Sequence, residues 1–353
     1  MIFRIFICIF ILDFKQVHSL SEEARKLVEK WAPLVWIHSE DPFMPSSVPF
    51  HLQNIQINDE NERLVQENPT QDSIVTGPDT DIMHMNTKYP VDCVNCFQPF
   101  FFGEDPSTAP MYTFVTEHLD SCSTVDVTYS MFYPYNYGKD VCVGLEEFGF
   151  CVGDWQTFGN HIGDWEHVSL RFQGGEPLMI YVGVHSFGAW YSWDRSANRF
   201  VFSHGEPLKK KTIRNGKTLE MRIDVDYPEF LDLEEGRPAV FSANGSHGVW
   251  AQPGKHTYLH ILTVHLDDFC DKGVSWKSWE NLKIYETGPL DQYTGEDSWI
   301  NFKGRWGNIK KLGCGLEPLI GECGLVGGPT GPHKYFKHDF QQPPACIPPR
   351  FHL

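Results

Sequence analysis

Apolar and polar residues alternate along several stretches in the middle of the chain. From Val125 to Tyr133, an apolar residue stands at every second position, and Asp126, Thr128 and Ser130 alternate with them. This period of two predicts a β-strand with one buried face. Shorter strands are predicted at residues 34–38, 166–172, 178–185, 239–243 and 256–266. The stretch 178–184 is nearly all apolar, which predicts a strand buried on both faces.

Helical patterns are short. Ser21 can cap a helix, Glu22 and Glu23 suit its positive end, and Pro33 predicts that it ends near Trp31. One further short helix is expected near residues 275–282. Residues 43–124 are rich in Asp, Asn and Pro and predict a layer of loops, and the Gly- and Pro-rich stretch from Gly304 is expected to wrap over the strands. The pattern favours a mostly β fold, an antiparallel β-sandwich with long disulfide-tied loops and a short N-terminal helix.

The first residues are typical of a secretory signal. Arg4 precedes the short apolar stretch 5–12, and Val17 and Ser19 are suitably placed before a cleavage point. We therefore expect a signal peptide at 1–19 and a single β-sandwich domain at 20–353. No later stretch is long and apolar enough to span a membrane. These features favour a secreted protein or one of the secretory pathway or vacuolar lumen.

Composition and charge exclude several classes of partner. The chain has 41% hydrophobic and 14% aromatic residues, which is enough for a large core. Its formal net charge of −17 argues against nucleic acid and against simple attachment to anionic lipid, and it is compatible with cation binding. The sequence does not indicate an oligomeric state.

Nine cysteines remain once Cys8 leaves with the signal. In an oxidising compartment most should pair, and the odd number leaves one thiol free or bonded to another chain. We favour structural disulfides over a zinc knuckle or redox motif at Cys93-x-x-Cys96, because no second such pair exists. The disulfide candidates are Cys93, Cys96, Cys122, Cys142, Cys151, Cys270, Cys314, Cys323 and Cys346.

The candidate site lies at the start of the strand predicted at 166–172. Asp164 and Glu166 share a face with Val168, Leu170 and Phe172, so two carboxylates begin a row that points into the core. Buried like charges must be protonated, paired with a basic group or bound to a metal. The alternative is that they are solvated at the end of the strand, or paired with Arg171 or Arg195.

A divalent cation is the interpretation that uses the neighbouring residues. His161 precedes Asp164 across Gly163, which permits a sharp bend, and one imidazole with two carboxylates suits Mg²⁺ or Ca²⁺ better than Zn²⁺. Asp154, His185 and His247 are candidates to complete or frame the pocket. His204 is taken as an ordinary hydrogen-bonded histidine, and Asn244 begins the N-glycosylation sequon.

Six short motifs follow one another along nearly the whole mature chain. They are Ala32-Pro33-Leu34-Val35, Phe132-Tyr133-Pro134-Tyr135-Asn136, His161-Ile162-Gly163-Asp164-Trp165-Glu166-His167-Val168, Gly245-Ser246-His247, Phe302-Lys303-Gly304-Arg305-Trp306-Gly307 and Gly327-Gly328-Pro329-Thr330-Gly331-Pro332. In these motifs and their order the chain resembles the vacuolar protein sorting-associated protein 62 family, and the resemblance implies a role in vacuolar sorting.

The central motif alone is also similar to the Gly-His-Arg-His-Asp-Trp-Glu heptapeptide of necrosis- and ethylene-inducing-like toxins. Those proteins are β-sandwiches whose heptapeptide helps to hold a divalent metal, so the similarity implies metal ligation by His161, Asp164 and Glu166. Asn160 stands where the toxins have Gly, and Gly163 where they have the second His. These departures put toxin activity in doubt.

Three functions follow in order of preference. The first is a divalent-cation-dependent binding protein that engages a glycan or a lipid headgroup. The second is a membrane-active protein of the cytolysin or insecticidal-toxin type. The third is a metal-dependent hydrolase, for which His167 or His185 would have to act as the base. An enzyme ranks last because the chain has no nucleophile elbow, P-loop, dinucleotide fingerprint or HExxH motif.

Overall fold

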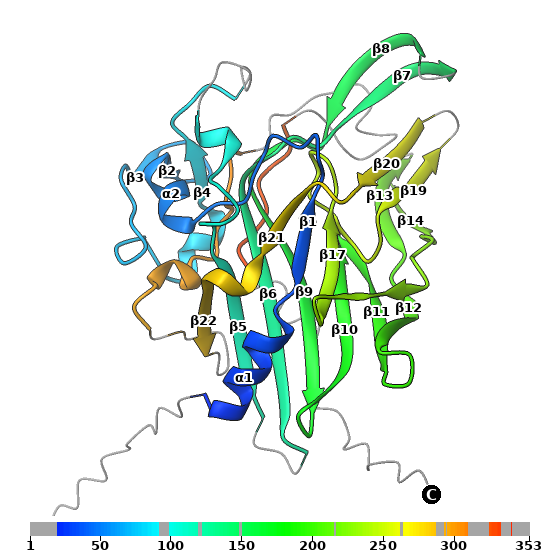
Figure 1. Cartoon of the computed structure of the whole chain (residues 1–353). Coiled ribbons are helices and arrows are strands. Elements are labelled where there is room, and N and C mark those ends of the chain that lie inside the picture. Colours follow the sequence, from blue (N-terminus) through cyan, green and yellow to red (C-terminus); the bar gives the residue numbers. More distant parts are fainter. Residues whose placement is uncertain are drawn as a thin grey trace, which may run out of the picture.

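The computed structural model describes residues 20–91, 99–118, 122–147, 150–214, 217–261, 264–286, 293, 295–309, 325–332 and 340 (Figure 1). The predicted signal peptide lies outside these residues and stays a prediction. Cys93, Cys96, Cys314, Cys323 and Cys346 lie outside them as well.

The largest sheet contains eight strands in the order β15-β12-β11-β10-β9-β6-β5-β22. Its long central pair is antiparallel, with Tyr133 opposite Asp164 and Met131 opposite Glu166. Only the edge pair β22–β5 is parallel among the described strands of this sheet. The strands are β5 (Met111–Glu117), β6 (Thr124–Asn136), β9 (His161–Gln173), β10 (Glu176–Val184), β11 (Phe187–Asp194), β12 (Arg199–Gly205), β15 (Phe230–Leu231) and β22 (Leu282–Glu286).

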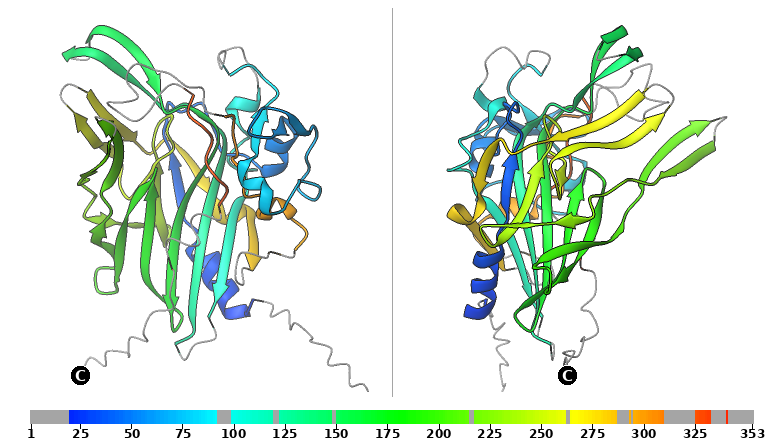
Figure 2. Two further views of the ribbon diagram at one scale, coloured as in Figure 1. Left: turned by 180° about the vertical axis from the view of Figure 1, so that it is seen from behind. Right: turned by 45° about the vertical axis from the view of Figure 1, so that its right-hand side comes forward.

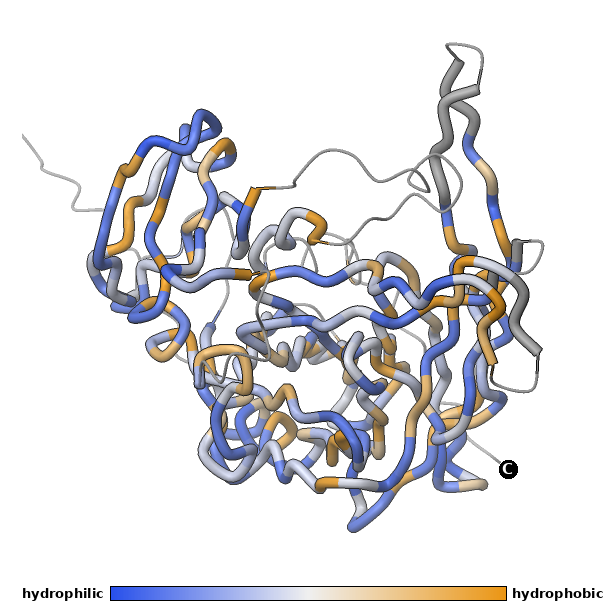
Figure 3. The backbone as a smooth tube through the Cα atoms, turned by 90° about the horizontal axis from the view of Figure 1, so that it is seen from above, coloured by the Kyte–Doolittle hydropathy of each residue, from blue (hydrophilic) through white to orange (hydrophobic). Residues whose placement is uncertain are grey.

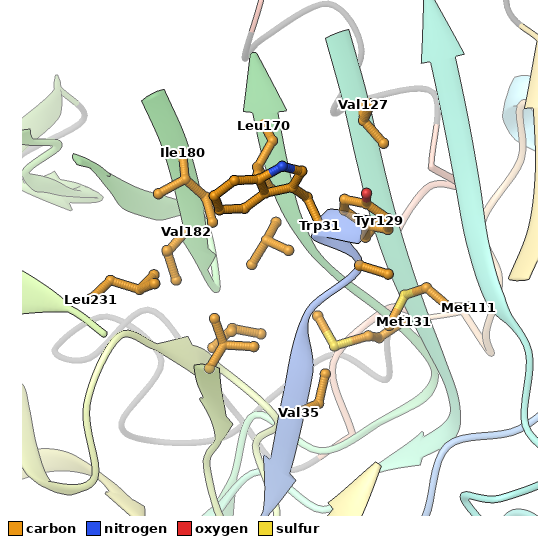
Figure 4. Packing of buried hydrophobic residues seen from close by; sticks show 14 of the residues in the cluster. Trp31, Val35, Met111, Val127, Tyr129, Met131, Leu170, Ile180, Val182 and Leu231 are labelled. Carbon is orange, nitrogen blue, oxygen red and sulfur yellow. The ribbon is translucent and has the colours of Figure 1, made fainter. Parts of the chain in front are cut away.

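A smaller sheet faces one side of this large sheet. Its strands are β1 (Leu34–Ile37), β16 (Leu233–Glu234), β17 (Arg237–Ser242), β18 (Val249–Trp250) and β21 (Val274–Lys277). Side chains of both sheets meet in one hydrophobic core, in which Val35 packs with Met131, Leu170 and Val182 (Figure 4). This core includes the row Val168, Leu170 and Phe172, so the face predicted to point inward does so.

A second core lies on the opposite face of β6 and β9. It contains Phe132, Ile162 and Trp165, and it is covered by elements from the stretch predicted to be loops. That prediction was wrong in part, because short elements form there without clear periodicity. They are α2 (Val48–Gln53), β2 (Ile55–Asn58), β3 (Leu64–Gln66), β4 (His84–Thr87) and the 3-10 helices η1 (Pro78–Ile82) and η2 (Pro99–Phe102). The stretch also contains β5 (Met111–Glu117), a full strand of the large sheet that was not predicted.

Three two-stranded hairpins complete the strands. They are β7–β8 (Lys139–Glu147 and Phe150–Phe158), β13–β14 (Leu208–Arg214 and Lys217–Ile223) and β19–β20 (Gly254–Ile261 and Val264–Cys270). The stretch predicted as one strand at 256–266 instead belongs to two paired strands, β19 and β20. The prediction was wrong because no Gly or Pro in this stretch indicates a break. Seen from above, hydrophilic and hydrophobic stretches follow one another along the strands (Figure 3).

Of the two predicted helices, the N-terminal one is confirmed and the one near residues 275–282 is wrong. Helix α1 (Glu22–Trp31) is confirmed, and the Ser21 hydroxyl accepts a hydrogen bond from the Ala24 amide as expected of an N-cap. The short helix predicted near 275–282 is instead β21 followed by the 3-10 helix η3 (Ser278–Asn281). A further 3-10 helix, η5, covers Ser298–Asn301. No helix among the described residues is long and apolar enough to cross a membrane.

The fold is thus mostly β, as predicted, with pairings that the alternation did not indicate. Among the described strands, β1–β17 and β22–β5 are parallel pairs, so the fold is not purely antiparallel. The disulfide with both partners described, Cys142–Cys151, joins the strands of the β7–β8 hairpin instead of tying down a loop. Cys122 is also disulfide-bonded. Cys270 corrects the list of disulfide candidates, because it is a buried free thiol.

Candidate functional site

A cavity of about 390 Å³ opens beside the first residues of β9. Its polar lining comes from six strands or turns, most of them distant in sequence. Aromatic rings of Phe158, Phe187 and Tyr258 form part of the wall. The polar side chains in the lining are Asn136, Lys139, His161, Asp164, Glu166, His185, Ser186, Lys209 and Ser246.

The start of β9 brings two carboxylates into this cavity. Asp164 and Glu166 are 4% and 5% exposed, which excludes the alternative that they are solvated at the end of the strand. Gly163 has φ +63, and a Cβ there would lie 2.1 Å from the Trp306 carbonyl oxygen. Only glycine allows this close approach in that conformation, so the predicted bend before Asp164 is confirmed.

Asp164 is neutralised by a buried histidine. Its Oδ2 accepts a hydrogen bond from Asn136 Nδ2 at 2.8 Å and lies 3.2 Å from His247 Nδ1. Burial opposes ionisation of Asp164, but His247, His161 and Asn136 outweigh it and hold the pKa of the carboxyl below its usual value. Of the three ways to stabilise a buried carboxylate, which are protonation, a basic partner and a bound metal, the structure therefore contains the basic partner.

His247 is fully buried and is itself held between two acids. Its Nε2 lies 3.6 Å from Asp41 Oδ2 and 3.2 Å from the Phe43 carbonyl oxygen, and its ring stacks on Tyr133 at 3.8 Å. Burial opposes the charged form, but Asp164 and Asp41 outweigh it and raise the pKa of His247. The partners suggested by sequence are elsewhere: Arg171 pairs with Asp126 at 2.6 Å, and Arg195 lies 3.5 Å from Glu176.

His161 is oriented by the backbone of the same bend. Its Nδ1 donates to the Gly163 carbonyl oxygen at 2.8 Å, because a carbonyl can only accept. Its Nε2 faces Asp164 Oδ1 at 3.9 Å, which is too long for a hydrogen bond. The bend thus aims one imidazole nitrogen and one carboxylate oxygen toward the same space.

A second buried carboxylate, Asp268, organises the opposite wall. It accepts hydrogen bonds from Lys139 Nζ at 2.6 Å, Ser246 Oγ at 2.7 Å, Trp250 Nε1 at 2.9 Å and His185 Nε2 at 3.0 Å. Burial opposes its charge, but Lys139 and His185 hold the pKa of Asp268 well below its usual value. This network fixes the positions of Lys139, His185 and Ser246 in the lining.

The predicted site residues divide into three groups. His161, Asp164, Glu166 and His185 line the cavity, and His247 lies behind Asp164 and holds it. Asp154 was expected to complete the pocket, but it is exposed on β8 and is absent from the lining. It lies four residues from Phe158, which is about 13 Å along a strand.

Two other sequence assignments concern residues near the site. His204 is exposed and stacks on Trp190, so it takes no part in the cavity. Asn244 is half-buried, and the hydroxyl of Ser246 in its sequon is engaged with Asp268. Glycosylation of Asn244 stays a prediction.

The imidazole of His161 and the carboxylates of Asp164 and Glu166 are donor types that suit a hard divalent cation, but they are not arranged as a metal site. Within the residues that the structure describes, no group of three or more His, Cys, Asp or Glu side chains is arranged to hold a metal ion. Oδ2 of Asp164 is already engaged by Asn136 and His247. Metal ligation by His161, Asp164 and Glu166 therefore stays a hypothesis.

Several functional residues were missed by sequence reasoning. Asn136 had a signal, because it ends the motif Phe132-Tyr133-Pro134-Tyr135-Asn136, and in the structure it ends β6 opposite His161. Lys139, Asp41 and Asp268 had none. Lys139 follows β6 by three residues, whereas Asp41, outside the strands, and Asp268, on β20, reach the site through the packing of segments far apart in the chain.

Comparison with known proteins gives one family. The sequence model described as vacuolar protein sorting-associated protein 62 matches residues 11–207. Two proteins of Saccharomyces cerevisiae are similar: the putative vacuolar protein sorting-associated protein TDA6, 26% identical over 350 residues, and vacuolar protein sorting-associated protein 62, 25% identical over 314 residues. The alignments cover 91% and 78% of this chain, and 68% and 58% of those proteins.

Two solved structures are similar at low scores. The non-toxic HaNLP3 protein has a TM-score of 0.29 and 10% identity, with 76% of this chain and 77% of that chain covered. NLPPya in complex with glucosamine has a TM-score of 0.33 and 9% identity, with 80% and 81% covered.

Proposed function

The chain belongs to the vacuolar protein sorting-associated protein 62 family, whose role is in vacuolar protein sorting, and from this premise we propose that it is a binding protein for a glycan. The ligand would occupy the cavity beside β9. The observation that carries the proposal is the convergence of pre-oriented acceptors and donors with aromatic rings in one cavity.

Pre-orientation is the main physical support. Asp164 and Asp268 are each fixed by several hydrogen bonds, so their neighbours in the lining do not have to be ordered when a ligand binds. Sugar hydroxyls donate well to ionised carboxylates, which form the stronger class of hydrogen bond. The apolar face of a sugar ring suits the aromatic wall of Phe187 and Tyr258.

The balance of charge favours a glycan over a phosphate headgroup. The lining contains Asp164 and Glu166 as well as Lys139 and Lys209, and Lys139 is already paired with Asp268. A phosphate would meet two carboxylates without a cluster of arginines to offset them. A neutral, hydroxyl-rich ligand avoids that repulsion.

A glycan array with the full chain tests the proposal. Ser186 lies exposed at the rim of the cavity, and Ser186→Trp should obstruct it without disturbing the buried network. Ala197→Trp, in an exposed turn between β11 and β12, is the matched control. We expect the unmodified chain and the control to bind the same glycans, and Ser186→Trp to lose them. Equal binding by all three would refute the assignment to this cavity.

A divalent cation is the second candidate, and one observation favours it. The hydrogen bond from His161 Nδ1 to Gly163 directs Nε2 toward Asp164 Oδ1, and a deprotonated Nε2 would be the metal ligand. Glu166, which lines the same cavity, would be the third ligand to Mg²⁺ or Ca²⁺. The cation would add positive charge for ligand oxygens. Metal analysis, together with melting temperatures with chelator and with added Mg²⁺ or Ca²⁺, decides this; no bound metal and no shift would exclude it.

The proposed compartment is the secretory pathway or the vacuolar lumen. Its support is the apolar start of the sequence and the Cys142–Cys151 disulfide, which persists in oxidising compartments. Intact mass before and after reduction would report both cleavage near Leu20 and the number of disulfides. A secreted sample that kept its first 19 residues would contradict the signal assignment.

Of the two candidate general bases for a hydrolase, His167 and His185, only His185 lines the cavity. His167 lies on the opposite face of β9 from Asp164, where its ring is 5.6 Å from Tyr181. His185 remains in the lining and is oriented by Asp268. The cytolysin alternative stays a prediction that a liposome-leakage assay with and without chelator would test.

A further inference from the structure

The β7–β8 hairpin projects beyond the neighbouring elements at the top of Figure 1 and in both views of Figure 2. Its two strands pair along nine positions, from Lys139 opposite Phe158 to Glu147 opposite Phe150. A two-stranded ribbon in water is marginally stable by itself. The Cys142–Cys151 disulfide crosslinks the strands and so restricts the hairpin's unfolded states.

The outer part of this hairpin exposes large apolar side chains. Phe150 is 77% exposed, Val152 is 71% exposed and Trp155 is 48% exposed. Near the base the pattern reverses, because Val141 and Phe158 are buried in a core cluster. A protruding element therefore keeps its base packed and presents apolar side chains farther out, which indicates a contact surface.

The exposed side chains lie on both faces of the ribbon. Successive residues of a strand point to opposite sides, so Phe150 and Val152 share one face and Trp155 lies on the other. A flat protein partner, or a second copy docked on one face, would cover one set and leave the other in water. An apolar medium that surrounds the outer hairpin covers both sets.

We propose that three exposed apolar side chains of the β7–β8 hairpin, Phe150, Val152 and Trp155, insert into the interfacial region of a lipid bilayer. Trp155 suits this position, because its ring is amphipathic and Trp is enriched at membrane interfaces. Insertion is shallow, in the boundary between headgroups and acyl chains. The hairpin sequence holds one lysine against Asp140, Glu146, Glu147 and Asp154, so neutral lipid fits better than anionic lipid.

Flotation of the full chain with phosphatidylcholine vesicles tests this proposal. The unmodified chain should float with the vesicles. The double variant Phe150→Ser/Val152→Ser and the single variant Trp155→Ser should each weaken vesicle binding, the former by at least about tenfold. The control is Leu64→Ser/Val65→Ser, which removes two exposed apolar side chains from β3 and should bind as well as the unmodified chain.

The outcomes separate the possible occupants of the hairpin. Failure of the unmodified chain to float, or equal loss in the Leu64/Val65 control, would overturn the proposal. Loss on changing one face only, together with a dimer in light scattering, would assign the hairpin to a second copy of the chain. The result is independent of glycan binding, because the Ser186→Trp variant leaves the outer hairpin unchanged and should still float.

Discussion

At the scale of single residues, the site is organised by buried charges that are paired before any ligand arrives. Sequence alternation identified Asp164 and Glu166 as carboxylates that point inward, and the structure confirms their burial. The alternation could not identify His247 as the partner, because 83 residues separate it from Asp164. The proximity of His247 to Asp164 and Asp41 depends on how distant segments pack.

Asp164→Asn should destabilise the protein strongly. The variant keeps the size of the side chain but leaves the His247 charge facing a neutral amide, and loss of one partner of a buried pair costs about 3–5 kcal/mol. Chemical denaturation should report a loss of that order. Asp154→Asn, on the exposed part of β8, is the control and should change the free energy of unfolding by less than about 0.5 kcal/mol. Equal effects would contradict the account of the pair.

His51 gives a pH dependence with a definite sign. It is fully buried beside Phe132, and burial lowers its pKa to about 3. Because the unfolded histidine has a pKa near 6.5, the unfolded state binds more protons between these values. The His51 contribution to stability is therefore complete above pH 6.5 and is lost as the pH falls toward 3, by up to about 1.4 kcal/mol per unit.

Denaturation at several pH values would check this sign by comparing the unmodified chain with His51→Phe. The loss on acidification should be smaller in the variant, since the titrating group is gone. His204→Gln, at an exposed histidine, should keep the pH dependence of the unmodified chain. Parallel curves for the unmodified chain and His51→Phe would show that His51 is not the group responsible.

At the scale of elements, periodicity predicted strands well where both ends carried turn signals. Helix α1, β1, β6, β9, β10 and β17 were all expected near their observed positions. The pattern did not predict β5, β7, β8 or β11–β14, and it merged β19 and β20 into one strand. It also predicted loops in residues 43–124, where short elements are held by the second core. The parallel pairing of β1 with β17 brings together segments about 200 residues apart, which no local pattern reports.

Gly163→Ala tests how the start of β9 is held against the segment that contains Trp306. An alanine Cβ would lie 2.1 Å from the Trp306 carbonyl oxygen, so backbone must move, and φ +63 adds about 1–2 kcal/mol. Gly175→Ala is matched, because Gly175 has φ +81 with no atom within 4 Å of the added Cβ. We expect the Gly163 variant to unfold at a clearly lower denaturant concentration than the Gly175 variant. Equal midpoints would mean that the contact with Trp306 does not constrain the bend.

At the scale of the whole molecule, β9 connects the fold to the proposed function. Its middle lies between β6 and β10 in the large sheet, and its first residues form one wall of the cavity. The motif that carries the family resemblance is thus the segment that positions Asp164 and Glu166. Sequence identified this wall, and the opposite wall around Asp268 needed the complete fold.

The most direct test of glycan binding is a crystal structure of the full chain with the glycan that binds best on the array. We expect a sugar ring inside the cavity, with at least one hydroxyl within hydrogen-bond distance of the Asp164 or Glu166 carboxylate. A glycan bound elsewhere on the molecule, with the cavity holding only solvent, would contradict it.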